Sequence, residues 1–62
     1  MTEYNTALAL KQARHALQLT QDAFAAALGI HQTTVARMEA GRLAIEPRTA
    51  LAVECLLRRS KD

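Results

Sequence analysis

The sequence predicts an all-α fold, namely a compact domain of four or five helices. Its length, its composition and the lack of strand patterns support this prediction. The chain has 62 residues, enough for one domain spanning 1–62. Half of the residues are hydrophobic, yet the only aromatic ones are Tyr4 and Phe24. Alanine and leucine, both strong helix formers, dominate instead. Finally, no alternating run of Val, Ile or Thr indicates a strand.

The first helix is expected to begin at Thr2 or Asn5 and to end at Leu17. Its apolar residues recur at three- and four-residue spacing, so they form one buried stripe: Ala7, Leu10, Ala13 and Leu17. This orientation leaves Lys11 and His15 toward the solvent.

The second helix is expected over residues 21–28, with Thr20 as its N-cap and Asp22 in its first turn. Gly29 then ends it. The inward side chains of this helix are Phe24, Ala25 and Leu28.

The third helix is expected to start at His31 or Gln32 and to end at Ala40, with Gly41 as a left-handed cap. Val35 and Met38 face inward and, with Phe24, Leu28 and Ile30, complete the predicted core.

The fourth helix is expected over residues 47–59, since Pro47 suits the first position of a helix. Ser60, Lys61 and Asp62 are then a frayed end. One broad apolar arc of this helix comprises Ala50, Ala52, Val53, Leu56 and Leu57. Leu51 and Cys55 form a second stripe, and the pattern leaves open which of the two faces the core.

A domain of this size cannot cover both apolar faces of the fourth helix by itself. The sequence therefore predicts an isologous homodimer. Its interface is expected to include Leu51, Ala52, Cys55 and Leu56, together with the loop residues Leu43 and Ile45.

Composition narrows the function class. The net charge of +2 permits nucleic acid as a partner without establishing it. Cys55 is the only cysteine, so no intrachain disulfide is possible and a reduced, cytoplasmic setting is expected. The longest apolar run, residues 23–28, is far too short to span a membrane. With two separated histidines, the chain offers no metal site, no cofactor site and no catalytic constellation, so it is not expected to be an enzyme.

Residues 20–41 carry the functional signal. Two short helices joined by so brief a break must cross steeply, which is a helix-turn-helix. Ala25 suits the crossing point, and Gly29 suits the turn. The outward face of the second of these helices has no carboxylate before Glu39, so it suits a groove of hydrogen-bonding base edges between phosphates.

The chain resembles the Cro/lambda-repressor-like helix-turn-helix regulators, also called XRE-type. The shared pattern is L-T-Q at 19–21, F-A-x-x-L-G-I at 24–30 and Q-x-T-V-x-R-x-E-x-G at 32–41. Leu10, Arg14 and the helix at Pro47 extend the resemblance over most of the chain.

This resemblance implies a role for each matching residue. The residues facing base edges are Gln32, Thr33 and Arg37, with Ala36 against a thymine methyl. The residues at the DNA backbone are Gln21, which also braces the recognition helix, Thr34 and Arg42. Arg14 and Glu39 are implied to form a buried structural ion pair.

Two positions depart from the family pattern. Family members commonly have Gly where Gln18 stands, so the first helix is expected to end differently here. They often have Ser or Thr where His31 stands, so the recognition helix is expected to lack its usual cap. His31 then donates to a phosphate, and its protonation strengthens binding at lower pH.

The resemblance implies a transcriptional regulator, a repressor of the phage, prophage or plasmid kind, whose dimer binds an inverted repeat in double-stranded DNA. The alternative is an antitoxin or adaptor of the same fold that acts mainly through protein contacts. Individual residues also have structural interpretations: an ordinary polar face for Gln32, Thr33 and Arg37, a solvated helix-end cation for His15, and a small buried apolar residue, rather than a redox sensor, for Cys55.

Overall fold

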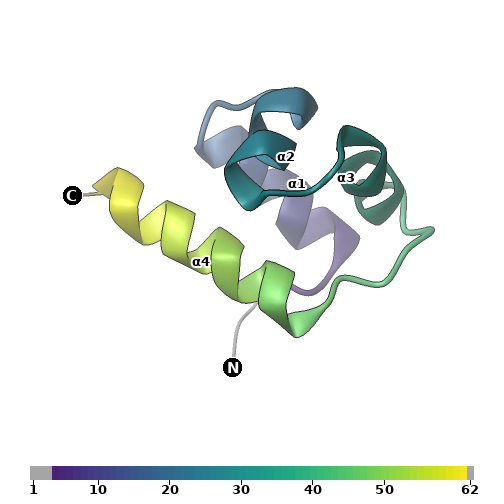
Figure 1. Ribbon diagram of the computed structural model, residues 1–62. Coiled ribbons are helices and arrows are strands. Elements are labelled where there is room, and N and C mark those ends of the chain that lie inside the picture. Colours follow the sequence, from purple (N-terminus) through teal and green to yellow (C-terminus); the bar gives the residue numbers. More distant parts are fainter. Residues whose placement is uncertain (1–3, 62) are drawn as a thin grey trace.

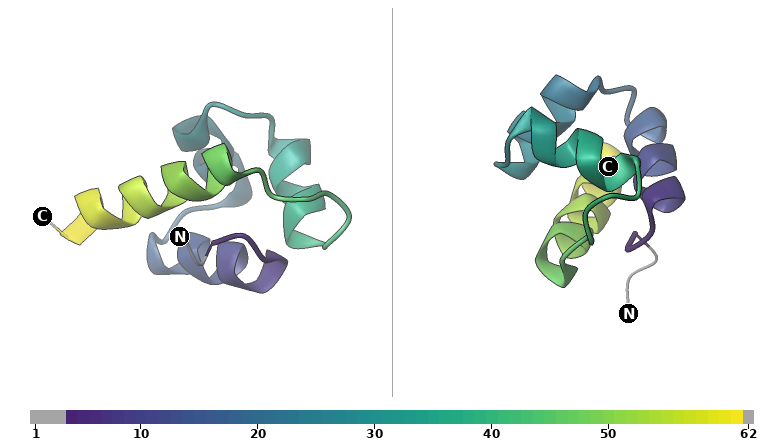
Figure 2. Two further views of the ribbon diagram at one scale, coloured as in Figure 1. Left: turned by 90° about the horizontal axis from the view of Figure 1, so that it is seen from below. Right: turned by 90° about the vertical axis from the view of Figure 1, so that its right-hand side faces the viewer.

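Four helices follow one another in the computed structural model, which describes residues 4–61 and the side chains of 4–60. They are α1 (Ala7–Ala16), α2 (Gln21–Leu28), α3 (Gln32–Glu39) and α4 (Pro47–Lys61). The first three gather around the N-terminal part of α4, and its C-terminal end extends past them (Figures 1 and 2). The described residues contain no strand, so the all-α fold is confirmed.

Threonine hydroxyl groups cap the N-termini of the first two helices. Thr6 Oγ1 accepts a hydrogen bond from the backbone N–H of Ala9 at 3.1 Å, so α1 begins at Ala7 rather than at Asn5. The other proposed start, Thr2, lies outside the described residues. Thr20 Oγ1 accepts from Ala23 N–H at 3.1 Å and starts α2 at Gln21, where the sequence predicts it.

The first three helices end in the same backbone motif, in which a left-handed residue lets two N–H groups bond back to the last turn. After α2 the left-handed residue is Gly29 (φ 73°), and after α3 it is Gly41 (φ 75°). After α1 it is Gln18 (φ 58°), whose N–H bonds to His15 O, while Leu19 N–H bonds to Arg14 O. The expectation of a different end at Gln18 is therefore wrong: glutamine adopts the conformation that glycine adopts more easily.

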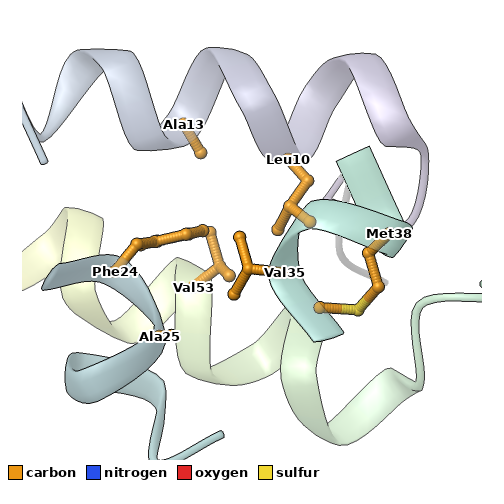
Figure 3. Packing of buried hydrophobic residues seen from close by; sticks show 7 residues of the cluster. All are labelled: Leu10, Ala13, Phe24, Ala25, Val35, Met38 and Val53. Atoms are coloured by element: carbon orange, nitrogen blue, oxygen red, sulfur yellow. The ribbon is translucent and has the colours of Figure 1, made fainter. Parts of the chain in front are cut away.

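One hydrophobic core joins all four helices (Figure 3). Its buried members are Leu10 and Ala13 from α1, Phe24 and Ala25 from α2, Val35 and Met38 from α3, and Val53 from α4. Each large apolar side chain that is fully buried contributes about 1.5–3 kcal/mol. Leu28 and Ile30 are partly buried and pack against this core.

Helix α4 turns its broad apolar arc inward. Ala50 and Val53 are fully buried, whereas Leu51 and Cys55 are exposed. The structure thus identifies the core-facing stripe, which the sequence pattern left open. It also corrects the interpretation of Cys55 as a buried apolar residue, because that side chain lies on the opposite side of the helix.

The end of α4 differs from the predicted frayed tail. Ser60 and Lys61 continue the helix, and Ser60 Oγ donates to Leu57 O at 3.0 Å. Asp62 lies outside the described residues. Within the described part of the chain, no helix combines the length and the hydrophobicity needed to cross a membrane.

Candidate nucleic-acid interface

Helices α2 and α3 pack against each other across a three-residue connection, 29–31. Gly29 redirects the backbone there because its left-handed conformation ends α2. Ala25 is buried in the core between the helices, and its small side chain permits their close approach. The two helices therefore form a helix-turn-helix with α3 as its second member.

Helix α3 has one buried and one exposed face. Val35 and Met38 anchor it in the core. On the outer side Gln32, Thr33 and Arg37 are exposed, and Ala36 is half-buried. Because residues four apart are neighbours on a helix, these side chains form two adjacent rows, Gln32 with Ala36 and Thr33 with Arg37. The structure therefore brings all four predicted base-facing residues onto one surface.

The C-terminal end of α3 is bonded to α1 by a two-bonded ion pair between Arg14 and Glu39, called the fork below. Arg14 Nε donates to Glu39 Oε2 at 2.7 Å, and Arg14 Nη2 donates to Glu39 Oε1 at 3.1 Å. Both side chains are shielded, with 12% of Arg14 and 4% of Glu39 exposed. Arg14 Nη1 also donates to the carbonyl of Leu19 at 3.0 Å, a contact with no signal in the sequence. This bidentate geometry fixes the orientation of both side chains.

Gln21 adds a third donor to the same carboxylate. Its Nε2 lies 3.2 Å from Glu39 Oε1, so the start of α2 is bonded to the end of α3. Through this contact Gln21 braces α3, which is the structural part of the role that the resemblance implied for it.

The three donors determine the charge state of Glu39. Burial alone would raise the pKa of its carboxyl. The hydrogen bonds from Arg14 and Gln21 and the positive charges of Arg14 and Lys11 outweigh that effect, so the pKa lies below its ordinary value. Glu39 is the only acid in α3, and its carboxylate is occupied inside the domain. The exposed face of α3 therefore presents no competing negative charge to a polyanion.

The predicted backbone contacts lie around this face. Arg42 is exposed just after Gly41, and its N–H bonds to Arg37 O at 2.9 Å. Thr34 is half-buried and lines a groove of about 220 Å³ between α3, the loop after it and the start of α4. The other groove residues are Ile30, Met38, Leu43, Ala44, Glu46, Arg48 and Thr49. Nothing in the sequence pattern indicated this groove.

His31 corrects the prediction that α3 lacks its cap. The residue has extended backbone angles (φ −78°, ψ 147°), and its Nδ1 accepts a hydrogen bond from Thr33 N–H at 3.2 Å. The imidazole thus does what a Ser or Thr hydroxyl does at this position. The physical reason is that an unprotonated ring nitrogen accepts a hydrogen bond as a hydroxyl oxygen does.

The predicted dimer residues fall into two groups. Leu51, which is 58% exposed, and Cys55 lie on the outer face of α4, and Ala52 beside them is half-buried. Ile45 and Leu56 are partly buried and pack against the core. Another leucine is still more exposed than Leu51, namely Leu8 on α1, at 66%.

Residues 4–60 contain no group of three or more His, Cys, Asp or Glu side chains that could hold a metal ion. His15 is exposed, with Nε2 3.3 Å from Arg14 Nη2.

The fold and the exposed face of α3 define a DNA-binding helix-turn-helix domain. A helix-turn-helix family model matches residues 10–62, and the chain belongs to this Cro/C1-type, XRE-like family of DNA-binding regulators. The family is one of regulatory domains and not typically of enzymes. A comparison with curated proteins and a comparison with solved structures each returned no significant match.

Proposed function

We propose that the protein is a transcriptional repressor that binds an inverted-repeat operator as a homodimer, with α3 in the major groove. One observation carries this proposal: α3 exposes Gln32, Thr33 and Arg37, while its only carboxylate is bonded to Arg14. Such a face meets base edges and phosphates without an unfavourable charge.

The exposed side chains have the chemistry for direct readout. Gln32 can pair with the N6 and N7 atoms of adenine, and Arg37 can pair with O6 and N7 of guanine. Each such pair discriminates by about 1–3 kcal/mol. Thr33 can bond to several bases, and the small side chain of Ala36 leaves room for a thymine methyl.

The residues around this face are proposed to bind phosphates. Arg42 is exposed beside the end of α3, and Gln21 and His31 lie at the starts of α2 and α3. Thr34 is the weakest of the set, because it is half-buried and lines the groove beside the start of α4. Phosphate contacts position a protein on DNA and make its affinity fall with salt.

A homodimer is supported by the outer face of α4. Leu51 and Cys55 are exposed on the side opposite the core, with Ala52 next to them, and Ile45 and Leu56 are partly buried and pack against the core. A two-fold contact there would bury apolar surface that a single domain leaves in water. Two recognition helices about 34 Å apart would then read two half-sites.

Selection of bound sites from a random double-stranded DNA library tests this function. The expected result is a site with dyad symmetry and half-sites about one helical turn apart. Enrichment of a single, asymmetric site would contradict the homodimer, and absence of any enrichment would contradict sequence-specific binding.

The exposed leucines favour a second candidate, an antitoxin or adaptor of the same fold that acts mainly through protein contacts. Leu51 and Leu43, which is 43% exposed, supply apolar surface for such a partner. This candidate predicts that the same selection returns no preferred sequence and that binding to DNA is weak at every salt concentration.

A further inference from the structure

The first turn of α3 is held by a single residue outside the helix, His31. Its backbone carbonyl accepts from Thr34 N–H at 3.0 Å and from Val35 N–H at 3.3 Å. Its side-chain Nδ1 accepts from Thr33 N–H at 3.2 Å. Three N–H groups of the first turn therefore end on His31, and one of them depends on the protonation state of a side chain.

The hydrogen bond from Thr33 N–H shows which nitrogen of the His31 ring carries the proton. A nitrogen that accepts a hydrogen bond carries no proton, so the neutral imidazole has its proton on Nε2. A doubly protonated ring has two donors and no acceptor, so it cannot cap the helix. Its positive charge would also lie beside the positive end of the α3 dipole.

The turn that this cap supports carries two of the proposed base-reading side chains, Gln32 and Thr33. Thr33 is the residue whose N–H is capped, so its backbone position depends directly on the ring of His31. The opposite end of α3 does not share this dependence, because the Arg14–Glu39 fork and Gly41 hold it.

We propose that His31 is a positioning residue that acts only as the neutral ring, so that protonation of its imidazole loosens the first turn of α3 and weakens DNA binding. The proposal rests on the proposed function. It reverses the sign expected from charge alone, because a cationic histidine near phosphates would strengthen binding at low pH.

Other charged groups lie on the elements that surround α3. On α1 they are Lys11, Arg14 and His15, and α2 carries Asp22 in its first turn, at the end far from His31. Glu46 and Arg48 line the groove that contains Ile30 and Thr34. Among residues 4–60, the side chain of His31 makes no ion pair, and its only hydrogen bond is the one to Thr33 N–H.

The first experiment measures DNA affinity against pH in a His15→Gln background, which leaves His31 as the only histidine. Fluorescence anisotropy at constant salt would cover about pH 8 to 5.5, where histidines in general take up their proton and carboxylates do not. The parent protein should lose about fivefold in affinity toward low pH, the factor typical of a lost N-cap. His31→Ser restores a cap with a hydroxyl that does not take up a proton in this range, so its affinity should not show this loss toward low pH.

A third variant, His31→Ala, should bind about fivefold more weakly than the serine variant at every pH. Tighter binding of the parent at low pH would overturn the proposal in favour of a simple attraction between the charged ring and phosphate. Equal affinity of the alanine and serine variants would overturn it too.

The second experiment needs no DNA, so it decides the inference even if the proposed function fails. Long-range proton–nitrogen NMR spectra of the free protein at about pH 8 should show the Nε2–H form of His31. The Thr33 amide should exchange with solvent about fivefold faster in His31→Ala and return to the parent rate in His31→Ser. An Nδ1–H ring, or an unchanged Thr33 exchange rate in the alanine variant, would refute the capping role.

Discussion

Arg14 and Glu39 are 25 positions apart in the sequence, yet two nitrogens of one guanidinium bond to the two oxygens of one carboxylate. This fork connects α1 to Glu39, the last residue of α3. It thereby holds α3 in place without using any of the side chains that face outward.

Removal of Arg14 should destabilise the protein strongly. The carboxylate of Glu39 is 4% exposed in the parent, and in Arg14→Ala it loses its charged partner, so the free energy of unfolding should fall by about 3 kcal/mol. Arg14→Lys should not restore it, because an ammonium group cannot form the fork. Urea denaturation measures both effects.

The matched control is Arg58→Ala, which breaks the exposed pair between Arg58 and Glu54 on α4. It should cost at most about 0.5 kcal/mol. Equal losses in Arg14→Ala and Arg58→Ala would show that the buried fork contributes no more than a surface ion pair.

The lowered pKa of Glu39 predicts a loss of stability in acid. Above about pH 4.3, the ordinary value for an unfolded glutamate, the charged carboxylate contributes its full stabilisation. As the pH falls below that value and through the lower pKa of folded Glu39, the carboxylate is protonated and this stabilisation disappears. Urea denaturation of the parent and of Glu39→Gln from about pH 7 to pH 3 should give a steeper decline for the parent. Equal declines in the stability of the parent and of Glu39→Gln would contradict a lowered pKa for Glu39.

Gln18→Gly should stabilise the protein. A glutamine at φ 58° is strained, and glycine adopts this conformation without a Cβ clash, so a gain of about 0.5–1 kcal/mol is expected. Thermal unfolding monitored by circular dichroism measures it. Gln12→Gly is the control, because the same change at an exposed position inside α1 should destabilise by about 1 kcal/mol. A lower melting temperature for Gln18→Gly would show that the side chain of Gln18 stabilises this turn.

Arg37→Ala and Arg42→Ala should weaken DNA binding in different ways. Loss of Arg37 should relax the preference at one guanine-containing position of the selected site. Loss of Arg42 should weaken binding to all DNA sequences alike. The slope of log affinity against log salt concentration should also fall by about 1, as expected for one lost phosphate contact. Affinity measured on the selected and on unrelated DNA, at several salt concentrations, separates the two. Uniform weakening by both changes would contradict the division between base and phosphate contacts.

Leu51→Glu should convert the proposed dimer to a monomer without unfolding it, since the side chain is exposed. Sedimentation velocity at micromolar concentration measures the change. Leu8→Glu is the control, because it places the same charge at a still more exposed leucine on α1 and should leave the dimer intact. A parent protein that sediments as a folded monomer would contradict the homodimer itself.

Local signals in the sequence were sufficient for most of the fold. Thr20, Gly29, Gly41 and Pro47 act within one helical turn of their own positions, so they can be recognised without knowledge of the tertiary structure. Glycine is not the only residue that can end a helix, however, and Gln18 shows that the residue type alone does not determine the conformation.

Contacts between distant segments could be anticipated only in part. The resemblance to a family suggested the pair formed by Arg14 and Glu39, but the third bond of Arg14, to Leu19, depends on the exact path of the chain after α1. The orientation of α4 likewise required the structure, because both of its apolar stripes satisfy the same periodicity.

The core that all four helices share links folding to binding. Because α3 is anchored through Val35 and Met38 to side chains from every other helix, it cannot unfold alone without exposing them. DNA that binds only the folded form should therefore stabilise the whole chain and raise its melting temperature. The stabilising free energy grows with the logarithm of the DNA concentration. A small domain of this kind is expected to be most resistant to proteolysis when it occupies its site on DNA.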